Sequence, residues 1–275
     1  MTKEKSPARQ GPRYIFYFLM LAILGWFMFM QFFGADERTV SGNSPSLLYP
    51  GTFTWEKPDG TTEEITVPGS YDVPAGETMV ITSTLPADFN ASSIAIRSSL
   101  QDVNIYINGT LREQYSTSKT RLIGKNSASR FIFCSTSHED AGKELRIELT
   151  TYTSNYSGVV NQIFCGDKAD IWQLIFNHYG LATYIAFFTL FAGLTTILFS
   201  LTLGFVYHTS FDMEYLGLCM IMGATWMLGE SKIRQLLIPN SSALASLCFV
   251  MILLGPIPLL LYADNVQHGL HRRLY

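Results

Sequence analysis

Residues 181–207 read LATYIAFFTLFAGLTTILFSLTLGFVY, a stretch without a single charged side chain. An α-helix rises about 1.5 Å per residue, so about 20 apolar residues are enough to cross a hydrocarbon core of ~30 Å. Trp172, Tyr179 and Tyr184 precede or open the stretch, and such rings favour the headgroup level of a bilayer. The sequence therefore predicts a membrane-spanning helix at this position.

Two more apolar runs lie nearer the C-terminus, over residues 213–229 and 243–262. The first of them is short, and Lys232 and Arg234 follow it closely. Each run is interpreted as a further span. Residues 167–177, before the longest run, are expected to form a short separate helix next to the membrane.

A fourth apolar run covers residues 14–33, and lysines and arginines cluster in residues 1–13 before it. Cytoplasmic flanks carry an excess of Lys and Arg, so residues 1–13 are expected inside the cell. The run is longer than a usual signal-peptide core, which favours an uncleaved signal anchor over the alternative, a cleaved signal peptide.

The resulting topology has about four spans, with both chain ends in the cytoplasm. Residues 34–170 form an extracytoplasmic domain, the outer segment reaches to about residue 178, and residues 171–275 form a partial helix bundle. The basic residues at 271–273 agree with a cytoplasmic C-terminal end, whereas Lys232 and Arg234 fall in an outer loop against the charge rule.

The outer domain shows the period-two pattern of β-strands. Val103, Ile105 and Ile107 alternate with polar or aromatic residues, and residues 145–149 repeat the pattern. Turn signals such as Asn108-Gly109 separate short strands at regular intervals. An all-β sandwich or jelly roll is expected.

Charge and cysteine content narrow the function classes. The net charge is −3, which lacks the basic excess that nucleic-acid binding requires, so no nucleic-acid partner is expected. Cys134 and Cys165 lie in the outer domain and could form a disulfide, or could equally be separate buried thiols. Cys219 and Cys248 lie in apolar segments and are interpreted as small hydrophobic residues.

No motif in the chain predicts catalysis or metal binding. Ser116 and Lys119 match a Ser-x-x-Lys pattern but lack the Ser-Asp-Asn and Lys-Thr-Gly elements that support this chemistry. His268 and His271 could share a helix face, yet a zinc site needs at least a third ligand. We expect no enzyme activity, no metal and no cofactor.

One polar set in the outer domain is a candidate ligand site. Guanidinium groups beside aromatic rings suit sugars or carboxylates. The alternative is that the tyrosines flank the core and the arginines solvate the surface. The candidate residues are Arg97, Tyr106, Tyr115, Arg121 and Arg130.

The order of parts resembles a family, the bacterial seven-transmembrane receptors with diverse intracellular signalling modules. The resemblance rests on Leu85-Pro86, VNIYING at residues 103–109, Gly142-Lys143, and Gly166-Asp167 ahead of the membrane. Residues 223–237, GATWMLGESKIRQLL, are similar to the Trp-x-x-x-Glu-Ser segment that these receptors often carry. The matching pieces extend from about Trp55 to the end, and each piece is degenerate.

The resemblance implies an outer jelly roll that binds carbohydrate or a related small ligand. It also implies a helix bundle that signals to a GGDEF diguanylate cyclase, a histidine kinase or a phosphatase. This chain departs from the pattern, because only three of the seven receptor helices follow the anchor and no output domain is present. It is therefore expected to be an N-terminal part, a truncated product or a half receptor that needs a partner.

The expected function is that of a sensor fragment in the bacterial cytoplasmic (inner) membrane. Its expected partners are membrane lipid, a small extracytoplasmic ligand, and a cytoplasmic signalling domain or a homodimer partner. The alternative is an envelope structural or assembly protein whose β-domain contacts another protein.

Overall fold

The computed structural model describes residues 47–121, 124–208, 213–238 and 240–266, and a few residues nearer the N-terminus. The chain divides into two compact units, Met1–Pro45 and Ser46–Tyr275. Most of the predicted signal anchor at 14–33 lies outside the described residues, as do residues 1–13 and 271–273.

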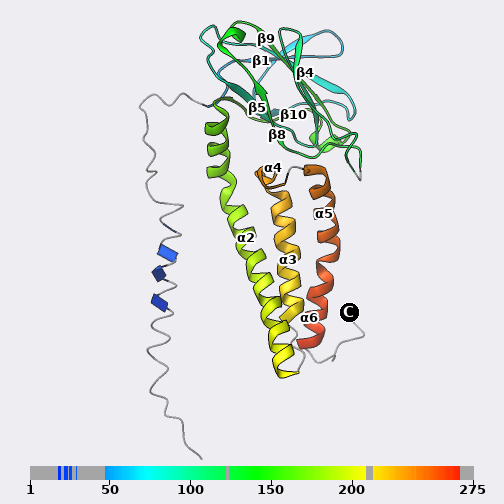
Figure 1. Cartoon of the computed structure of the whole chain (residues 1–275). Helices are drawn as coiled ribbons and strands as arrows, with labels where there is room; N and C mark the ends of the chain where they lie inside the picture. Colours follow the sequence, from blue (N-terminus) through cyan, green and yellow to red (C-terminus); the bar gives the residue numbers. More distant parts are fainter. Residues whose placement is uncertain are drawn as a thin grey trace, which may run out of the picture. The chain divides into compact units, whose positions relative to one another are not determined.

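The second unit contains a β-rich region whose larger sheet has six antiparallel strands in the order β2-β1-β4-β9-β6-β7 (Figure 1). Its strands are β1 (Phe53–Glu56), β2 (Thr62–Ile65), β4 (Thr78–Thr84), β6 (Asp102–Ile107), β7 (Thr110–Tyr115) and β9 (Glu144–Thr150).

A second sheet has three strands in the order β11-β5-β8, and a third has the pair β10-β3. Their strands are β11 (Ile163–Gly166), β5 (Ser93–Arg97), β8 (Phe131–Ser135), β10 (Val159–Val160) and β3 (Gly69–Ser70). Two 3-10 turns, η2 (His138–Asp140) and η3 (Ser154–Tyr156), complete the region.

The predicted alternation is present, because β6 buries every second residue, including Val103, Ile105 and Ile107. These side chains share one hydrophobic core with Ile94 and Ile96 of the three-stranded sheet. A fully buried isoleucine contributes about 1.5–3 kcal/mol relative to an exposed one, so this shared core holds the two sheets face to face.

The predicted turn at Asn108-Gly109 joins β6 to β7. Both residues have positive φ, 50° for Asn108 and 72° for Gly109, the geometry of a two-residue hairpin that follows strand twist. Asn and Gly tolerate this region of φ, which is why the dipeptide predicts the hairpin correctly.

The opposite face of the three-stranded sheet packs against helical segments. Ala95 and Phe131 of this sheet form a separate apolar cluster with Ile171, Ile175 and Ile233. The three-stranded sheet is therefore covered on both faces, which explains why residues 93–96 of β5 are buried without interruption.

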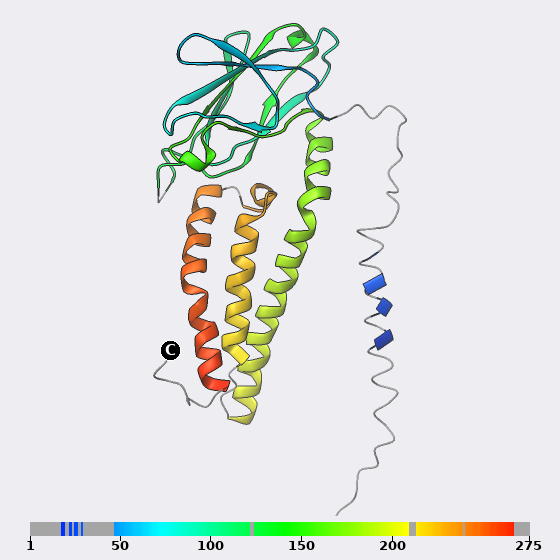
Figure 2. The ribbon, with the colours of Figure 1, turned by 180° about the vertical axis from the view of Figure 1, so that it is seen from behind.

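The helical part consists of α2 (Lys168–Tyr207), α3 (Met213–Glu230), α4 (Arg234–Leu237), α5 (Ser241–Leu254) and α6 (Pro256–Val266). Figures 1 and 2 show α2, α3 and the α5–α6 pair running side by side in both views. α5 gives way to α6 at Gly255, where Pro256 cannot donate to the backbone ladder.

The prediction of a separate short helix at 167–177 is wrong. α2 is one continuous helix of 40 residues, about 60 Å at the rise of an ideal helix. No proline interrupts Lys168–Tyr207, and Gly180 keeps helical geometry. A span needs about 20 residues, so α2 is long enough to cross a membrane and still reach the sheet.

Among the described residues, two helices are long and apolar enough by length and composition to cross a membrane. The first is α2, Lys168–Tyr207, with a mean hydropathy of 1.9. The second is Ser242–Asn265, which takes α5 and α6 together and has a mean hydropathy of 2.5. α3 occupies the predicted third span, but it begins and ends close to Glu214 and Glu230 and is not one of this pair.

Candidate functional site

The segment after α3 meets the edge strand β8 through paired hydrogen bonds. The backbone N–H of Phe131 donates to Oε1 of Gln235 at 2.6 Å, and Nε2 of Gln235 donates to the Phe131 carbonyl at 3.0 Å. One side-chain amide thus replaces a neighbouring strand, which satisfies an edge that would otherwise expose its donor and acceptor.

Arg234 adds a second link beside Gln235. Its Nη2 donates to the Ser129 carbonyl at 2.6 Å, and its Nη1 donates to the Gly229 carbonyl at 2.5 Å. The residue is only 8% exposed, so its charge is held by carbonyl dipoles away from water. A single side chain joins the end of α3 to the segment before β8.

Helix α2 contacts both the segment after α3 and strand β8. The hydroxyls of Thr183 and Ser231 are 2.6 Å apart and buried, and Ser231 Oγ accepts from the backbone N–H of Ile233. Trp172 lies 5.9 Å from Phe131 and 5.1 Å from Phe133 between ring centroids. Aromatic pairs at such distances add about 0.5–1.5 kcal/mol beyond their buried area.

We define the junction as the outer face of the three-stranded sheet together with residues 171–179 of α2 and residues 231–235. It combines an apolar centre with polar links that have fixed directions. Such a contact holds two elements in one arrangement and can transmit a displacement between them.

A hollow of about 440 Å³ opens between β1, β2 and the start of β11. Tyr49, Phe53 and Ile65 give it apolar walls, while Glu64 and Gln162 supply polar groups. Small-molecule sites have volumes of ~300–1,000 Å³ and this mixture of walls. The hollow is therefore the candidate ligand site of the β-rich region.

Three of the predicted ligand residues lie near the junction. Arg97 ends β5 opposite Phe131 in the strand register. Burial lowers the pKa of Arg97, and the charge of Arg234 lowers this pKa further. Arg130 stacks on Tyr115 at 5.4 Å, and burial raises the pKa of the Tyr115 hydroxyl, which donates to the Ala128 carbonyl.

The other two predicted ligand residues lie elsewhere. Tyr106 donates to Glu148 at 3.3 Å on the outer face of the six-stranded sheet, because β6 turns Ile105 and Ile107 toward the core. Arg121 donates to the Lys125 carbonyl within its own loop. The structure therefore does not bring the five residues together as one site.

Of the two alternatives for Cys134 and Cys165, the structure shows separate thiols, since both cysteines are free. Each pairs with Ile94, from the two opposite neighbours of β5. Two strand spacings separate them by roughly 9.6 Å, beyond the ~7 Å that a disulfide can bridge. Burial raises the pKa of Cys134 to about 11 and also raises that of Cys165, so both stay as thiols.

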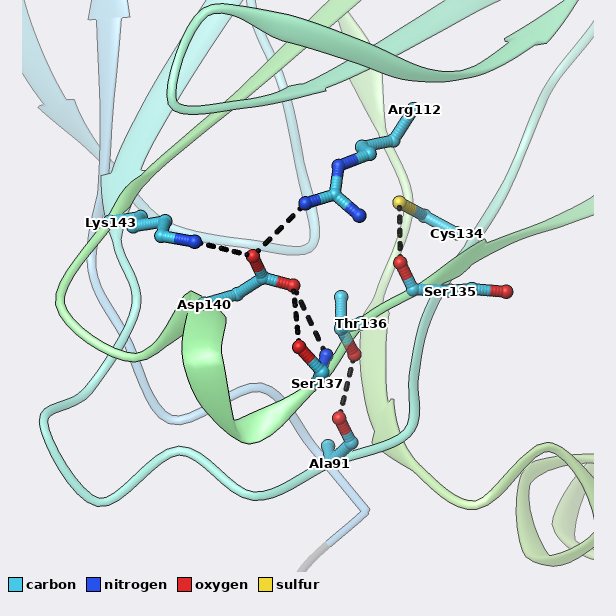
Figure 3. Close-up of polar contacts among 8 residues, drawn as sticks. All are labelled: Ala91, Arg112, Cys134, Ser135, Thr136, Ser137, Asp140 and Lys143. Atoms are coloured by element: carbon cyan, nitrogen blue, oxygen red, sulfur yellow. Dashed lines mark hydrogen bonds and ion pairs between the residues drawn. The ribbon is translucent and has the colours of Figure 1, made fainter.

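The turn at His138–Asp140 holds a buried carboxylate between two partly exposed cationic neighbours. Asp140 is 1% exposed, and it accepts from Lys143 at 3.0 Å and Arg112 at 3.1 Å (Figure 3). Its other oxygen accepts from the Ser137 backbone N–H at 3.1 Å, which closes a capping box.

Burial alone would raise the pKa of Asp140, but the bonds from Lys143 and Ser137 and the charge of Arg112 outweigh it. The pKa of this carboxyl therefore lies below its ordinary value. The cluster is structural, because it fixes the turn between β8 and β9. Within the part of the chain that the structure describes, no group of three or more metal-binding side chains occurs.

Sequence reasoning missed Ser231, Arg234 and Gln235 as contact residues. Lys232 and Arg234 stood out only because they oppose the charge rule for an outer loop. In the structure Arg234 is bonded to the carbonyl of Ser129, just before β8.

No family model matches the chain, and no curated protein matches it. Two similar solved structures are both β-glucosidases from Kluyveromyces marxianus. The glucose complex has a TM-score of 0.27 and 13% identity, covering 54% of this chain and 20% of that one. The selenomethionine-labelled form has a TM-score of 0.22 and 15% identity, with coverage of 39% and 13%. The chain thus matches only about a fifth or less of the length of these enzymes.

Proposed function

We propose that this protein is a membrane-bound sensor whose β-rich region binds a small ligand and passes its state to the helices. One observation carries the proposal. Strand β11 begins at the hollow, where Gln162 and Ile163 line the wall, and ends at Gly166, which a single residue separates from Lys168, the first residue of α2.

The hydrogen bonds around β11 make this route short and stiff. Ile163 accepts from the backbone N–H of Tyr49 at 3.1 Å, and Cys165 donates its N–H to Leu47 at 2.9 Å. On its other side β11 pairs with β5 along its whole length. A ligand that moves the wall of the hollow therefore acts directly on the start of α2.

The junction supplies a second connection, to the end of α3 through Arg234 and Gln235. Binding can shift the helices only if the ligand prefers one of their arrangements. Because α2 and α3 meet the sheet at separate points, a change in the sheet can alter their relative position.

The wider proposal places the protein in the bacterial cytoplasmic membrane as a multi-pass receptor with about four spans. Residues 34 to about 178 face outward, and the β-rich region within residues 34–170 forms a jelly roll. The chain carries no enzyme activity and signals to a cytoplasmic output module, such as a diguanylate cyclase, on further sequence or on a partner chain. Two apolar helices and the resemblance in residues 223–237 support this view.

The ligand class follows from the walls of the hollow. Exposed Glu64 and partly exposed Gln162 suit the hydroxyl groups of a sugar, while the buried Tyr49 and Phe53 form the apolar backing of the wall. Carbohydrates are therefore the first class to test, followed by amino acids and carboxylates.

The test measures thermal unfolding of the full chain in detergent against this panel. A ligand at a hundredfold excess over its Kd contributes ~2.7 kcal/mol, enough to raise Tm by a few degrees. We expect one compound to raise Tm, Gln162→Ala to abolish the rise, and Gln114→Ala, at an exposed position on β7, to keep it.

Hydrogen exchange then tests the relay. The same compound should change protection at the start of α2 and around Ile233. A compound that binds without changing either segment would contradict the relay. A panel without any stabilising compound would argue against the small-molecule sensor and favour an assembly protein with a protein partner.

A further inference from the structure

Three cationic side chains lie around the junction, near Tyr179 of α2. Arg97 ends β5 opposite Phe131. The backbone of Phe131 is hydrogen-bonded to Gln235, and Gln235 is next to Arg234 in the sequence. Lys232 places its Nζ 3.9 Å above the ring centroid of Tyr179. The strand register and these contacts bring Arg97, Lys232 and Arg234 to one side of the sheet.

These cations have little negative charge around them. Within the described ranges, no Asp or Glu lies at ion-pair distance from Arg97, Lys232 or Arg234. Glu230 acts on Arg97 only weakly, through space, and its own side chain is exposed. Arg234 is satisfied by two carbonyls, whereas Arg97 and Lys232 are partly exposed and donate no side-chain hydrogen bond to any residue that the structure describes.

The position of the cluster along α2 indicates which anion is close by. Tyr179 lies directly before the apolar stretch 181–207, at the point where a membrane helix leaves the hydrocarbon. Lys232 is stacked on this ring, so its ammonium lies at the same level. Phosphate groups of lipids occupy this level of a bilayer, and cationic side chains held there attract a lipid whose headgroup carries a net negative charge.

We propose that Arg97, Lys232 and Arg234 form a binding site for the phosphate group of an anionic phospholipid. Arg97 and Lys232 contact the phosphate, and buried Arg234 adds positive potential behind them. The inference depends on α2 crossing a bilayer, as in the proposed function, but it does not depend on the ligand hollow.

The test uses the full chain in a neutral detergent and native mass spectrometry. Phosphatidylglycerol is titrated as the anionic probe and phosphatidylcholine as the zwitterionic one. We expect at least about tenfold tighter binding of phosphatidylglycerol, which corresponds to ~1.4 kcal/mol. The double variant Arg97→Gln/Lys232→Gln should lose this preference.

The double variant Arg146→Gln/Lys57→Gln is the matched control. It also removes one arginine and one lysine charge, but Arg146 pairs with Glu148 and Lys57 pairs with Glu63, away from the junction. The control should keep the preference for phosphatidylglycerol. An equal loss in this variant would show a general charge effect and would overturn the site.

Inorganic phosphate separates a lipid from a free anion. It should leave phosphatidylglycerol binding unchanged at millimolar concentration, and displacement of the lipid would instead assign the site to a soluble anion. Equal affinity for both lipids would also overturn the proposal. Gln162→Ala should not affect lipid binding, so a failure here is distinguishable from a failure of the ligand hollow.

Discussion

Asp140 depends on its neighbours, because a buried carboxylate is stable only while donors and cations offset its lost hydration. Asp140→Asn removes the charge that Arg112 and Lys143 share. Since both cations are partly exposed, we expect a loss of about 1–3 kcal/mol in the free energy of unfolding. Urea unfolding of the full chain in detergent measures it. Glu139→Gln, at an exposed position in the same turn, should change little.

The same carboxyl predicts a dependence of stability on pH. Its pKa is lower in the folded protein than in the unfolded chain, so its contribution is present above the unfolded value of about 3.9. That contribution is lost as pH falls through the lower, folded pKa. The difference in Tm between wild type and Asp140→Asn should therefore be constant near neutral pH and shrink below about pH 4. A difference that grows in acid would contradict the assignment.

At the scale of single elements, Gln235 completes the edge of β8. Gln235→Ala leaves the N–H and carbonyl of Phe131 without their partner, which costs about 1–3 kcal/mol where water cannot replace it. We expect faster hydrogen exchange of the Phe131 amide and a lower Tm. Gln114→Ala, on the exposed face of β7, should leave that amide protected. Unchanged exchange in Gln235→Ala would show that this bond is absent in solution.

Helices α2 and α3 cross at two glycines. A Cβ at Gly193 would lie 2.8 Å from the carbonyl oxygen of Gly217, and a Cβ at Gly217 would lie equally close to that of Gly193. Backbone atoms cannot move aside, so Gly193→Ala should force the helices apart and lower Tm. Gly223→Ala, with open space around it, should be neutral or slightly stabilising. Comparable Tm losses in both variants would contradict this crossing.

Local patterns predicted individual elements better than their contacts. The period-two alternation located β6 and β9, and Asn108-Gly109 located the hairpin turn between β6 and β7, because these signals lie within a few residues. The continuity of α2 was missed, since a change from polar to apolar composition was interpreted as a helix boundary. Composition changes where a helix leaves a membrane, but only a breaker such as Pro256 interrupts the backbone ladder.

At the scale of the whole molecule, the junction depends on contacts between distant parts of the sequence. Phe131 and Gln235 are 104 positions apart, and neither residue has a local feature that indicates the other. The five candidate ligand residues are not gathered in one place for the same reason, because Arg97 and Tyr106 lie on different sheets and face different neighbours. Which side chains lie together depends on which strands pair and on which face of the sheet each residue lies. The pairing of β11, β5 and β8 could not be derived from the alternation of apolar and polar residues alone.

The junction also decides whether the β-rich region and the helices unfold together. Ile175 is 2% exposed in the apolar cluster with Ala95 and Phe131, so Ile175→Ala removes buried methyl groups at a cost of about 2–5 kcal/mol. If this contact couples the two parts, calorimetry of the wild-type chain in detergent gives one transition, and Ile175→Ala separates it into two.

Leu174 offers the control on the same helical turn, because it is 38% exposed and lies outside that cluster. Leu174→Ala should retain the single transition with a small change in Tm. Two transitions already in the wild type would mean that the sheet and the helices unfold independently. The sheet could then not bias the helices through this contact, and a relay from the hollow would have to pass through the covalent link from β11 to α2 alone.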